Sequence, residues 1–540
     1  MGWVSGLYPP TVKAGRRGTS DVLLSGCKEQ GCRRQYRLLP LAADGAESEG
    51  VSVPNMPAAG QARFITGNIM RHVVVMAGTG AVGLIAVFAV DLLNLFYISL
   101  LGQRQIAAAI GFAGVVGFFQ TSALIGLTIG VSVVVARSVG AGTARAARHV
   151  AGSGLALMVL TGLVVGLGTV ALLTPILNTL GASGETRSLA KSFLMISSPF
   201  LPLFAAGMCC SGLLRCIGDA RRAMNVTLFA ALVTAVMDPI LIFGLHLGLP
   251  GAAISTVLSR CVLATLGWHW AARRHDLVGR PSLRALAGDM AGILHVALPA
   301  VLTNLATPVG AAYVTRTMAT FGPDAVAGQA TIDRISPVAF GLIYALSGAV
   351  GPILAQNVGA GQLDRVRETL RDSFIFVLAT VLAAWAILAA AQELVVRAFF
   401  ARGVTAELVH LFCSWLAAGF LFTGALFVAN AAFNNLGYPV LSTVFNWGRA
   451  TLGTFPLVTY GAKFGPAGLL IGQASGSVIF GTLAVITAFR VVGRLGDAVY
   501  QHGNGMAIPA GSGNTALATL AVRPWRDWHL PLHRHTQAAG

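Results

Sequence analysis

Charged residues are scarce in this chain, and their scarcity argues against a soluble fold. Only 11% of the 540 residues are Asp, Glu, Lys or Arg, whereas a soluble domain has about 25%. Acidic residues are the rarest of these, with 20 against 37 Lys and Arg, which gives a formal net charge of +17. The mean hydropathy is +0.73. Most side chains therefore cannot face water, and we expect a membrane protein.

Cysteine is also rare, and the usual catalytic motifs are missing. The seven cysteines are scattered, and Cys27 and Cys32 lie close together without the histidine partners of a zinc site. The chain has no HExxH, no GxSxG and no phosphate loop ending in GK[ST]. We therefore expect neither an enzyme nor a bound cofactor.

The positive charge does not indicate a nucleic-acid partner. Nine of the 37 Lys and Arg precede residue 72 and five follow from Arg490 onward, so many of them flank the apolar part of the chain. No basic stripe is interleaved with aromatic residues. We expect membrane lipids as partners, no nucleic acid, and a monomer.

Long uncharged runs predict helices that cross a bilayer. A membrane span needs roughly 20 predominantly apolar residues, and the uncharged runs, extended a little, reach that length. The fold class that we predict is an all-α polytopic membrane protein with twelve transmembrane helices. The predicted spans are 72–101, 106–136, 149–174, 189–214, 223–245, 250–272, 291–320, 326–356, 372–391, 405–434, 441–461 and 466–489.

The loop charges predict the orientation. With the N-terminus inside the cell, the cytoplasmic loops between spans carry 13 Lys and Arg and the outer loops carry 6, which favours both termini in the cytoplasm and a multi-pass protein of the cell inner (plasma) membrane. No secretory signal is recognisable in the first residues. The predicted parts are a disordered cytoplasmic tail (1–68), an N-terminal six-helix bundle (69–275), a cytoplasmic linker (276–290), a C-terminal six-helix bundle (291–492) and a cytoplasmic C-terminal tail (493–540).

The two halves of the chain repeat each other. The tetrapeptide VGAG occurs at 139–142 and again at 358–361, an offset of 219 residues, and Gly218 matches Gly437 at the same offset. Each repeat holds six predicted spans, so both halves have the same orientation. The repeat is therefore parallel, and its pseudo-two-fold axis should run along the membrane normal. Two such bundles suit a transporter that rocks around a substrate held between them.

Carboxylates deep inside spans are the candidate functional groups, because a charge in hydrocarbon is costly. Three acids lie away from span ends: Asp91, Asp238 and Asp333. From the helix rise, Asp91 lies roughly 15 Å and Asp238 about 10 Å below the outer surface. Thr234 precedes Asp238 by one turn. Two ordinary interpretations stay open: Asp238 could cap a bend before Pro239, and Asp91 could pair with a nearby hydroxyl or arginine.

The doubled motifs resemble the multidrug and toxic compound extrusion (MATE) family of cation-coupled exporters. The resemblance rests on VARSVGAGTARAARH (135–149), its echo LAQNVGAGQLDRVRE (354–368), LLRCIGDARRAMN (213–225) and MDPILIFGLHLGLPGAAIST (237–256). The DinF-like branch is the most similar. This likeness implies that Asp91, Asp238 and Thr256 take part in coupling to H⁺ or Na⁺, with sodium as a possible metal ion at these three residues. Thr234 stands where relatives often have Asn.

The same resemblance implies export of amphipathic, cationic small molecules by antiport. Polar residues of the C-terminal half are candidates for the substrate cavity, namely Asn304, Arg316, Asn430 and Asn434. For Asp333 we expect a structural ion pair with Arg334. The main alternative is a lipid-linked oligosaccharide flippase of the same wider superfamily. A membrane-embedded transferase and an ion channel fit less well, since no polar loop cluster is present and the carboxylates gather in one half.

Overall fold

A computed structural model describes residues 62–504 apart from 101–103 and 281–282, and these described residues form helices and turns without a strand. The chain divides into two compact units, Met1–Asn55 and Met56–Gly540, and the first lies outside the described residues. Within the described residues, eleven segments are long and apolar enough to cross a membrane. The last of them, Pro439–Leu495, is an antiparallel hairpin in which Gly461 packs against Gly468. It therefore contains two passes, and the twelve predicted passes are confirmed.

The N-terminal bundle contains eight α-helices because two of its six passes are interrupted. Its α-helices are α1 (Ile69–Leu100), α2 (Arg104–Gly140), α3 (Ala144–Ala171), α4 (Leu173–Thr179), α5 (Gly184–Ser197), α6 (Leu201–Cys216), α7 (Ala220–Pro239) and α8 (Gly248–Trp268). Its shorter turns are the 3₁₀ turn η1 (Ser198–Phe200) and the π-helical turns η2 (Ile240–Gly244) and η3 (His269–Arg274).

The C-terminal bundle repeats this plan with more interruptions. Its α-helices are α9 (Leu283–Met318), α10 (Pro323–Ala339), α11 (Gly341–Gly359), α12 (Leu363–Ala390), α13 (Gln392–Ala398), α14 (Val404–Ser414), α15 (Phe420–Leu436), α16 (Pro439–Gly448), α17 (Phe455–Gly461) and α18 (Gly465–Asn504). Its turns are the 3₁₀ turns η4 (Ala319–Phe321), η5 (Leu416–Gly419) and η7 (Ala462–Phe464) and the π-helical turn η6 (Arg449–Gly453).

Several predicted boundaries need correction. Residues 62–68 belong to the fold and not to the predicted tail 1–68, because Phe64 is only 2% exposed. Residues 1–61 of that tail lie outside the described residues. Helix α9 begins inside the predicted linker 276–290, and α18 continues to Asn504 through the start of the predicted tail 493–540. The hydropathy of a span says where apolar residues stop, but a helix continues past that point wherever its backbone stays hydrogen-bonded.

Helix ends follow local sequence signals, and the repeat is visible in them. Asp219 caps α7 by accepting a hydrogen bond from the backbone N–H of Arg222. Both VGAG turns end a helix with a glycine at φ +72°, Gly142 after α2 and Gly361 after α11. This left-handed conformation is one that glycine adopts without steric cost. The sequence repeat is therefore also a repeat of backbone conformation.

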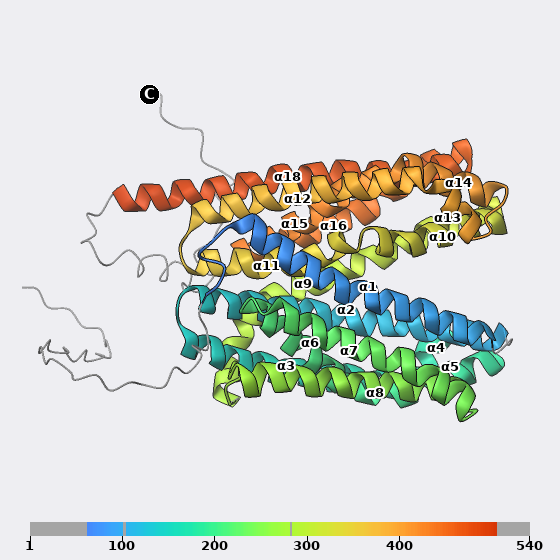
Figure 1. Cartoon of the computed structure of the whole chain (residues 1–540), viewed down its shortest axis with the longest axis horizontal. Coiled ribbons are helices and arrows are strands. Elements are labelled where there is room, and N and C mark those ends of the chain that lie inside the picture. The colour runs from blue at the N-terminus through green and yellow to red at the C-terminus, as the bar shows by residue number, and fades with distance from the viewer. Residues whose placement is uncertain (1–61, 101–103, 281–282, 505–540) are drawn as a thin grey trace, which may run out of the picture. The chain divides into compact units, whose positions relative to one another are not determined.

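The first helix of each bundle packs partly in the core of the other bundle. Ile69, Val73 and Met76 of α1 join the apolar core formed by the C-terminal bundle. In the same way, Ile293 and Ala297 of α9 join the core of the N-terminal bundle. The boundary between the bundles is formed by α2 against α9 and by α1 and α2 against α11 (Figure 1). This exchange holds the two bundles together along one half of their length.

The two VGAG turns meet each other at the end of the boundary. A Cβ on Gly140 would collide with the carbonyl oxygen of Gln356, and a Cβ on Gly359 would collide with the carbonyl oxygen of Arg137. Residues 137 and 356 are equivalent in the repeat, as are residues 140 and 359. The guanidinium of Arg137 also donates to the carbonyl oxygen of Asn435 at 2.5 Å. Only glycine fits these two positions, so the motif closes the space between the bundles at this end.

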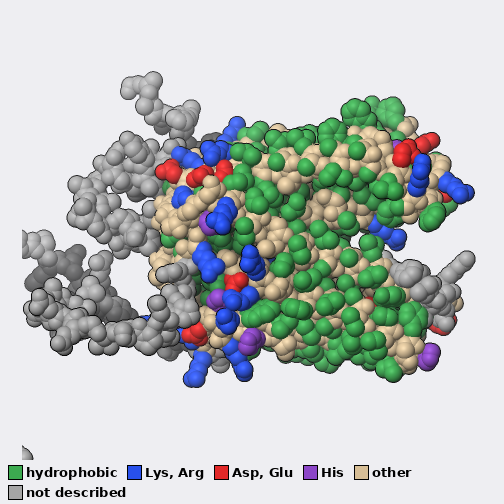
Figure 2. All heavy atoms as spheres, in the orientation of Figure 1, with side chains coloured by type: hydrophobic (Ala, Val, Ile, Leu, Met, Phe, Trp, Pro, Cys, Tyr) green, Lys and Arg blue, Asp and Glu red, His purple; other side chains and the backbone are tan. Residues whose placement is uncertain are grey.

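The surface shows how the bundles sit in a membrane. In Figure 2, hydrophobic side chains cover the flanks of the molecule, and Lys and Arg gather at one end. That end carries Arg145 and Arg148 of α3 and Arg367 and Arg371 of α12. Large apolar side chains such as Val164 and Ile387 are more than 60% exposed, as expected for a lipid-facing surface. The chain is a multi-pass membrane protein.

Candidate functional site

Asp238 lies at the end of α7, where the helix changes its pitch. Pro239 follows directly and lacks the N–H that an α-helix needs, and the chain continues as the π-helical turn η2. The Asp238 side chain is 1% exposed, and neither carboxylate oxygen has a hydrogen-bond partner. It therefore does not cap the bend, which removes one ordinary interpretation. Single-turn π-helices occur frequently at functional sites.

The hydroxyl of Ser255 on α8 is the group that approaches Asp238. Ser255 lies on the same face of α8 as Gly251 and Ser259, which contact Leu241 and Ala230 on either side of Asp238. Its hydroxyl is also buried without a partner in hydrogen-bond geometry. An isolated buried carboxylate without donors is costly. The pair is therefore suited to receive a proton or a small cation, which would satisfy both groups at once.

Two contacts fix the register of α1 against α7. Gly83 packs against Thr227, and the rings of Tyr97 and Phe243 lie 6.2 Å apart at their centroids. The two contact partners are separated by 144 residues in the first pair and by 146 in the second. Because this separation is nearly constant, the two segments run parallel. Asp238 then falls beside residues 92–94 of α1. Asn94 carries a buried side-chain oxygen that also has no partner.

Two further contacts place α8 against α7 in the opposite direction. The Ser259 hydroxyl donates to the carbonyl oxygen of Ala230 at 2.8 Å, and Gly251 packs against Leu241. This register puts Thr234 and Thr256 close to the level of Asp238. Their hydroxyls donate to carbonyl oxygens of their own helices, at 3.3 Å and 3.0 Å. Each threonine oxygen keeps lone pairs with which it can bind a cation.

Asp91 lies at this level on α1, but the structure does not join it to Asp238. Its side chain is exposed, and none of the six ion pairs of the described residues includes either carboxylate. The described residues also hold no group of three or more His, Cys, Asp and Glu that could bind a metal ion. A small cation here would therefore rest on Asp238, Ser255 and Asn94, with Asp91, Thr234 and Thr256 at the same depth. We call these six residues the candidate cation site.

Of the four residues that we expected to line the substrate cavity, the structure brings together Asn430 and Asn434. Asn430 and Asn434 belong to a network inside the C-terminal bundle, where they accept hydrogen bonds from Asn446 at 3.0 Å and from Ser442 at 3.1 Å. The amide of Asn304 donates to the carbonyl oxygen of Ala300 at 2.8 Å. Arg316 is exposed near the end of α9. Three of the four side chains thus bond within the bundle.

The structure does not pair Asp333 with Arg334. Asp333 instead accepts a hydrogen bond from Gln329 at 2.9 Å, and neither Asp333 nor Arg334 occurs in the six ion pairs of the described residues. Consecutive residues of a helix point about 100° apart, whereas residues four apart face each other. Gln329 is therefore the partner that helix geometry favours.

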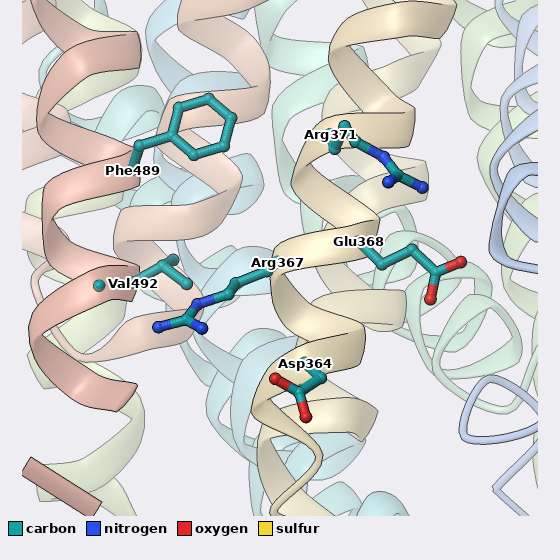
Figure 3. A pocket seen from close by; sticks show the side chains of 7 residues that line it. Asp364, Arg367, Glu368, Arg371, Phe489 and Val492 are labelled. Atoms are coloured by element: carbon teal, nitrogen blue, oxygen red, sulfur yellow. The ribbon is translucent and has the colours of Figure 1, made fainter. Parts of the chain in front are cut away.

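Two grooves lie at the end where the arginines gather, far from Asp238 along the helices. The larger, of about 650 Å³, lies between α12 and α18 and is lined by charged residues of both signs. In Figure 3, Arg367 points toward Val492 of α18, whereas Arg371 and Glu368 point away from it. The smaller, of about 230 Å³, is lined by Arg145, Arg148 and Asp276. Arg148 and Arg367 are equivalent in the repeat, so each groove contains an arginine from the same repeat position.

The sequence pointed to Asp238 but missed Ser255 and Asn94, whose buried polar atoms have no partner and which the helix registers place near it. Ser255 and Ser259 lie four residues apart on α8, which puts both on one helix face. That spacing could have identified Ser255. Asn94 gave no comparable signal, because a neutral amide does not stand out in an apolar span.

Comparisons with known proteins agree with this architecture. The family model MatE matches residues 81–240 and again 299–458. The FAD transporter of Shewanella oneidensis is 27% identical over 439 residues, covering 79% of this chain and 96% of that protein. The probable multidrug resistance protein NorM of Thermotoga maritima is 24% identical over 396 residues, covering 70% and 83%.

Among solved structures, the MATE transporter VcmN of Vibrio cholerae has the same fold. It superposes with a TM-score of 0.75 at 21% identity, over 78% of this chain and 97% of that chain. The two family-model matches fall one on each bundle, and together they cover more than half of the sequence. The chain therefore belongs to the MatE family, whose members are membrane transporters and not enzymes.

Proposed function

We propose that this protein is a secondary active exporter that moves amphipathic small molecules out of the cell in exchange for H⁺ or Na⁺. The observation that carries the proposal is the buried carboxylate of Asp238, which has no hydrogen-bond partner and faces an equally unpartnered Ser255. A coupling ion needs a binding site whose occupancy shifts the equilibrium between two conformations of the protein. In this proposal, Asp238 is that site in the N-terminal bundle.

The ion acts by changing the charge of a buried group. With Asp238 ionised, the bundle holds an uncompensated charge, and repacking that buries it further is costly. When a proton or sodium ion binds, that cost disappears, and the bundle can rock against its partner. The contacts of Gly140 and Gly359 close one end of the boundary between the bundles. Alternating access requires these contacts to separate when the protein opens to the other side.

The distribution of the arginines suggests how the protein is oriented in the membrane. The arginine-rich end is the cytoplasmic one, with both termini inside, and the membrane is the cell inner membrane. The closed end of the boundary is then the cytoplasmic end. The transported partner is a small molecule, lipids surround the bundles, and the working unit is a monomer.

An oligosaccharide flippase is less well supported by the arginines inside the spans. Arg260 donates to the carbonyl oxygen of Ser197 and lies over the Phe204 ring at 5.6 Å, so it is engaged within the N-terminal bundle. Arg316 and Arg334 are exposed. Arg260 is therefore not free to join the basic lining that a pyrophosphate-linked sugar would need.

The test is export from proteoliposomes under imposed gradients. Purified protein is reconstituted with ethidium as a fluorescent probe, and an inward-directed gradient of either sodium or protons is applied. We expect one of the two gradients to accelerate ethidium movement and the ionophore that dissipates it to abolish the effect. If the rate of ethidium movement is the same with and without each gradient, secondary active transport is excluded.

A further inference from the structure

Tyr344 lies where the two bundles meet, surrounded by aromatic rings from both. Its ring is 6.4 Å from that of Phe88 on α1, in the N-terminal bundle. On the other side it is 5.8 Å from Phe427 and 6.4 Å from Phe420, both on α15 of the C-terminal bundle. Edge-to-face and tilted contacts of this kind leave ring faces on which a further aromatic group can stack.

A cation without a partner lies next to this aromatic group. Arg449 begins the π-helical turn η6, and its buried Nε atom has no hydrogen-bond partner. None of the six ion pairs in the described residues includes Arg449. Asn446 donates to Asn430 at 3.0 Å and Ser442 donates to Asn434 at 3.1 Å, which fixes the antiparallel register of α16 against α15. This register puts Arg449 opposite Phe427, whose ring contacts Tyr344. An arginine in a membrane span is expected to be paired or functional, because its burial without a counter-charge is costly.

Asp333 on α10 does not neutralise Arg449. It accepts a hydrogen bond from Gln329 at 2.9 Å, its side chain is exposed, and it occurs in none of the six ion pairs of the described residues. A molecule stacked on the Tyr344 ring would therefore be held with an acidic substituent toward Arg449.

We propose that Tyr344 and Arg449 form a subsite for an aromatic molecule that carries an acidic group, a phosphate or a carboxylate. The guanidinium binds the acid through charge-assisted hydrogen bonds, and Tyr344, Phe88 and Phe427 hold the ring. The inference names a substrate class for the transport proposed above and rests on that function. The sequence alone led us to expect cationic substrates, whereas the charge at this position favours an acidic one. The similarity to an FAD transporter agrees with this class.

The subsite can be tested with two ligands that differ by one phosphate. Riboflavin and flavin mononucleotide share their ring, and quenching of their fluorescence reports binding to the purified full-length protein in detergent. We expect flavin mononucleotide to bind roughly tenfold more tightly, as charge-assisted hydrogen bonds allow. Arg449→Gln should remove that preference, and Tyr344→Ala should weaken both ligands. Arg397→Gln, which removes an exposed arginine of the same bundle on α13, should keep the preference.

Two further measurements test whether the Arg449→Gln variant is misfolded and whether a carboxylate can replace the phosphate. Arg449→Lys retains the charge and should keep part of the preference, which excludes misfolding as the cause of its loss. Pyrenebutyrate compared with pyrenebutanol tests a carboxylate in place of the phosphate. Equal binding of riboflavin and flavin mononucleotide by the unaltered protein, or a preference that survives Arg449→Gln, would overturn the subsite. Gradient-driven ethidium export in the same preparation separates the outcomes: it can persist when the subsite fails, and it is lost when the proposed transport function fails.

Discussion

Asp219 and Asp238 lie at the two ends of α7 in opposite surroundings. Asp219 accepts hydrogen bonds from the side chain and backbone N–H of Arg222 and lies 2.8 Å from Nε2 of His275. Asp238 is buried with neither oxygen bonded. The first carboxylate holds the turn between α6 and α7 in place, whereas the second has no structural partner. We therefore expect the first to affect stability and the second to affect transport.

The stability contributed by Asp219 should depend on pH. Burial raises the pKa of Asp219, but the hydrogen bonds from His275 and Arg222 outweigh it, so its pKa lies below the usual value. A depressed pKa contributes stability that is present above the unfolded value, about 3.9, and is lost as the pH falls through the folded value. Asp219→Asn, which can still cap α7, should cost about 1 to 2 kcal/mol at pH 7.

Thermal unfolding in detergent at pH 7 and below pH 4 checks this. The difference between the variant and the unaltered protein should shrink at the lower pH. Asp276→Asn is the matched control, because the ion pair of Asp276 with Arg148 is about half exposed on both sides and contributes little. A deficit of Asp219→Asn that is the same at both pH values would contradict the assigned charge interaction.

Ser255 should matter more to ion coupling than Thr256. Ser255 faces the Asp238 carboxylate, whereas the Thr256 hydroxyl proton is engaged with Ala252. We expect Ser255→Ala to raise the sodium or proton concentration needed for half-maximal export by about 3- to 10-fold. Thr256→Ala should change it less. The opposite order of the two effects would place Thr256 and not Ser255 beside the bound ion.

At the scale of elements, the two VGAG turns act as a pair. The glycines at 140 and 359 pack against the backbone of the opposite turn, so an added methyl group has no space. We expect Gly140→Ala to destabilise the closed end of the boundary by about 1 to 3 kcal/mol through overpacking. The protein should then populate a state in which the loops of the two bundles at this end separate.

Spin labels at the exposed, repeat-equivalent positions 145 and 364 report this separation, in a chain whose seven native cysteines are replaced. Gly140→Ala should lengthen the distance between the labels. Gly117→Ala is the control on the same helix, because a Cβ there meets nothing within 4 Å. An unchanged distance in Gly140→Ala would mean that the turns do not hold the bundles together.

The sequence predicts best those elements that depend on a pattern extending over many residues. The twelve passes follow from hydropathy, and the parallel repeat follows from the spacing of Gly140 and Gly359. The site could be predicted only where one residue breaks a pattern, as Asp238 does in an apolar run. Ser255 and Thr256 are neighbours in sequence, but the turn of a helix decides which one faces Asp238. Phe88, Tyr344 and Arg449 are far apart along the chain, and only the packed bundles bring them together.

At the scale of the molecule, a short segment before α1 joins the two bundles. The backbone N–H of Phe64 donates to Gln356 at 2.9 Å, and its carbonyl oxygen accepts from Arg365 at 3.0 Å. Its ring packs near Gly218 of the N-terminal bundle. Gln356 in turn donates to the carbonyl oxygen of Cys216 at 2.6 Å. Phe64 thus contacts both bundles at the closed end.

Shortening the chain from its N-terminus should therefore leave its stability unchanged until Phe64 is removed. A chain that begins at Met56 retains Phe64, and we expect it to insert, to unfold at the same temperature and to export normally. A chain that begins at Met70 lacks the segment and should be less stable. Phe64→Ala in the full chain should cost about 3 to 5 kcal/mol, the usual range for a buried phenylalanine. Equal unfolding temperatures for the two shortened chains would show that the segment does not stabilise the closed end.

The measurement that tests the account most directly is gradient-driven export by Asp238→Asn. Asp238 bonds to no backbone group, so the variant should insert, unfold at nearly the same temperature and still bind the transported probe. It cannot release or take up a charge, so neither a sodium nor a proton gradient should accelerate export by the variant in proteoliposomes. Asp91→Asn is measured beside it, and the double variant should be no worse than Asp238→Asn alone if the two act as one site. Normal export by Asp238→Asn under both gradients would contradict the account.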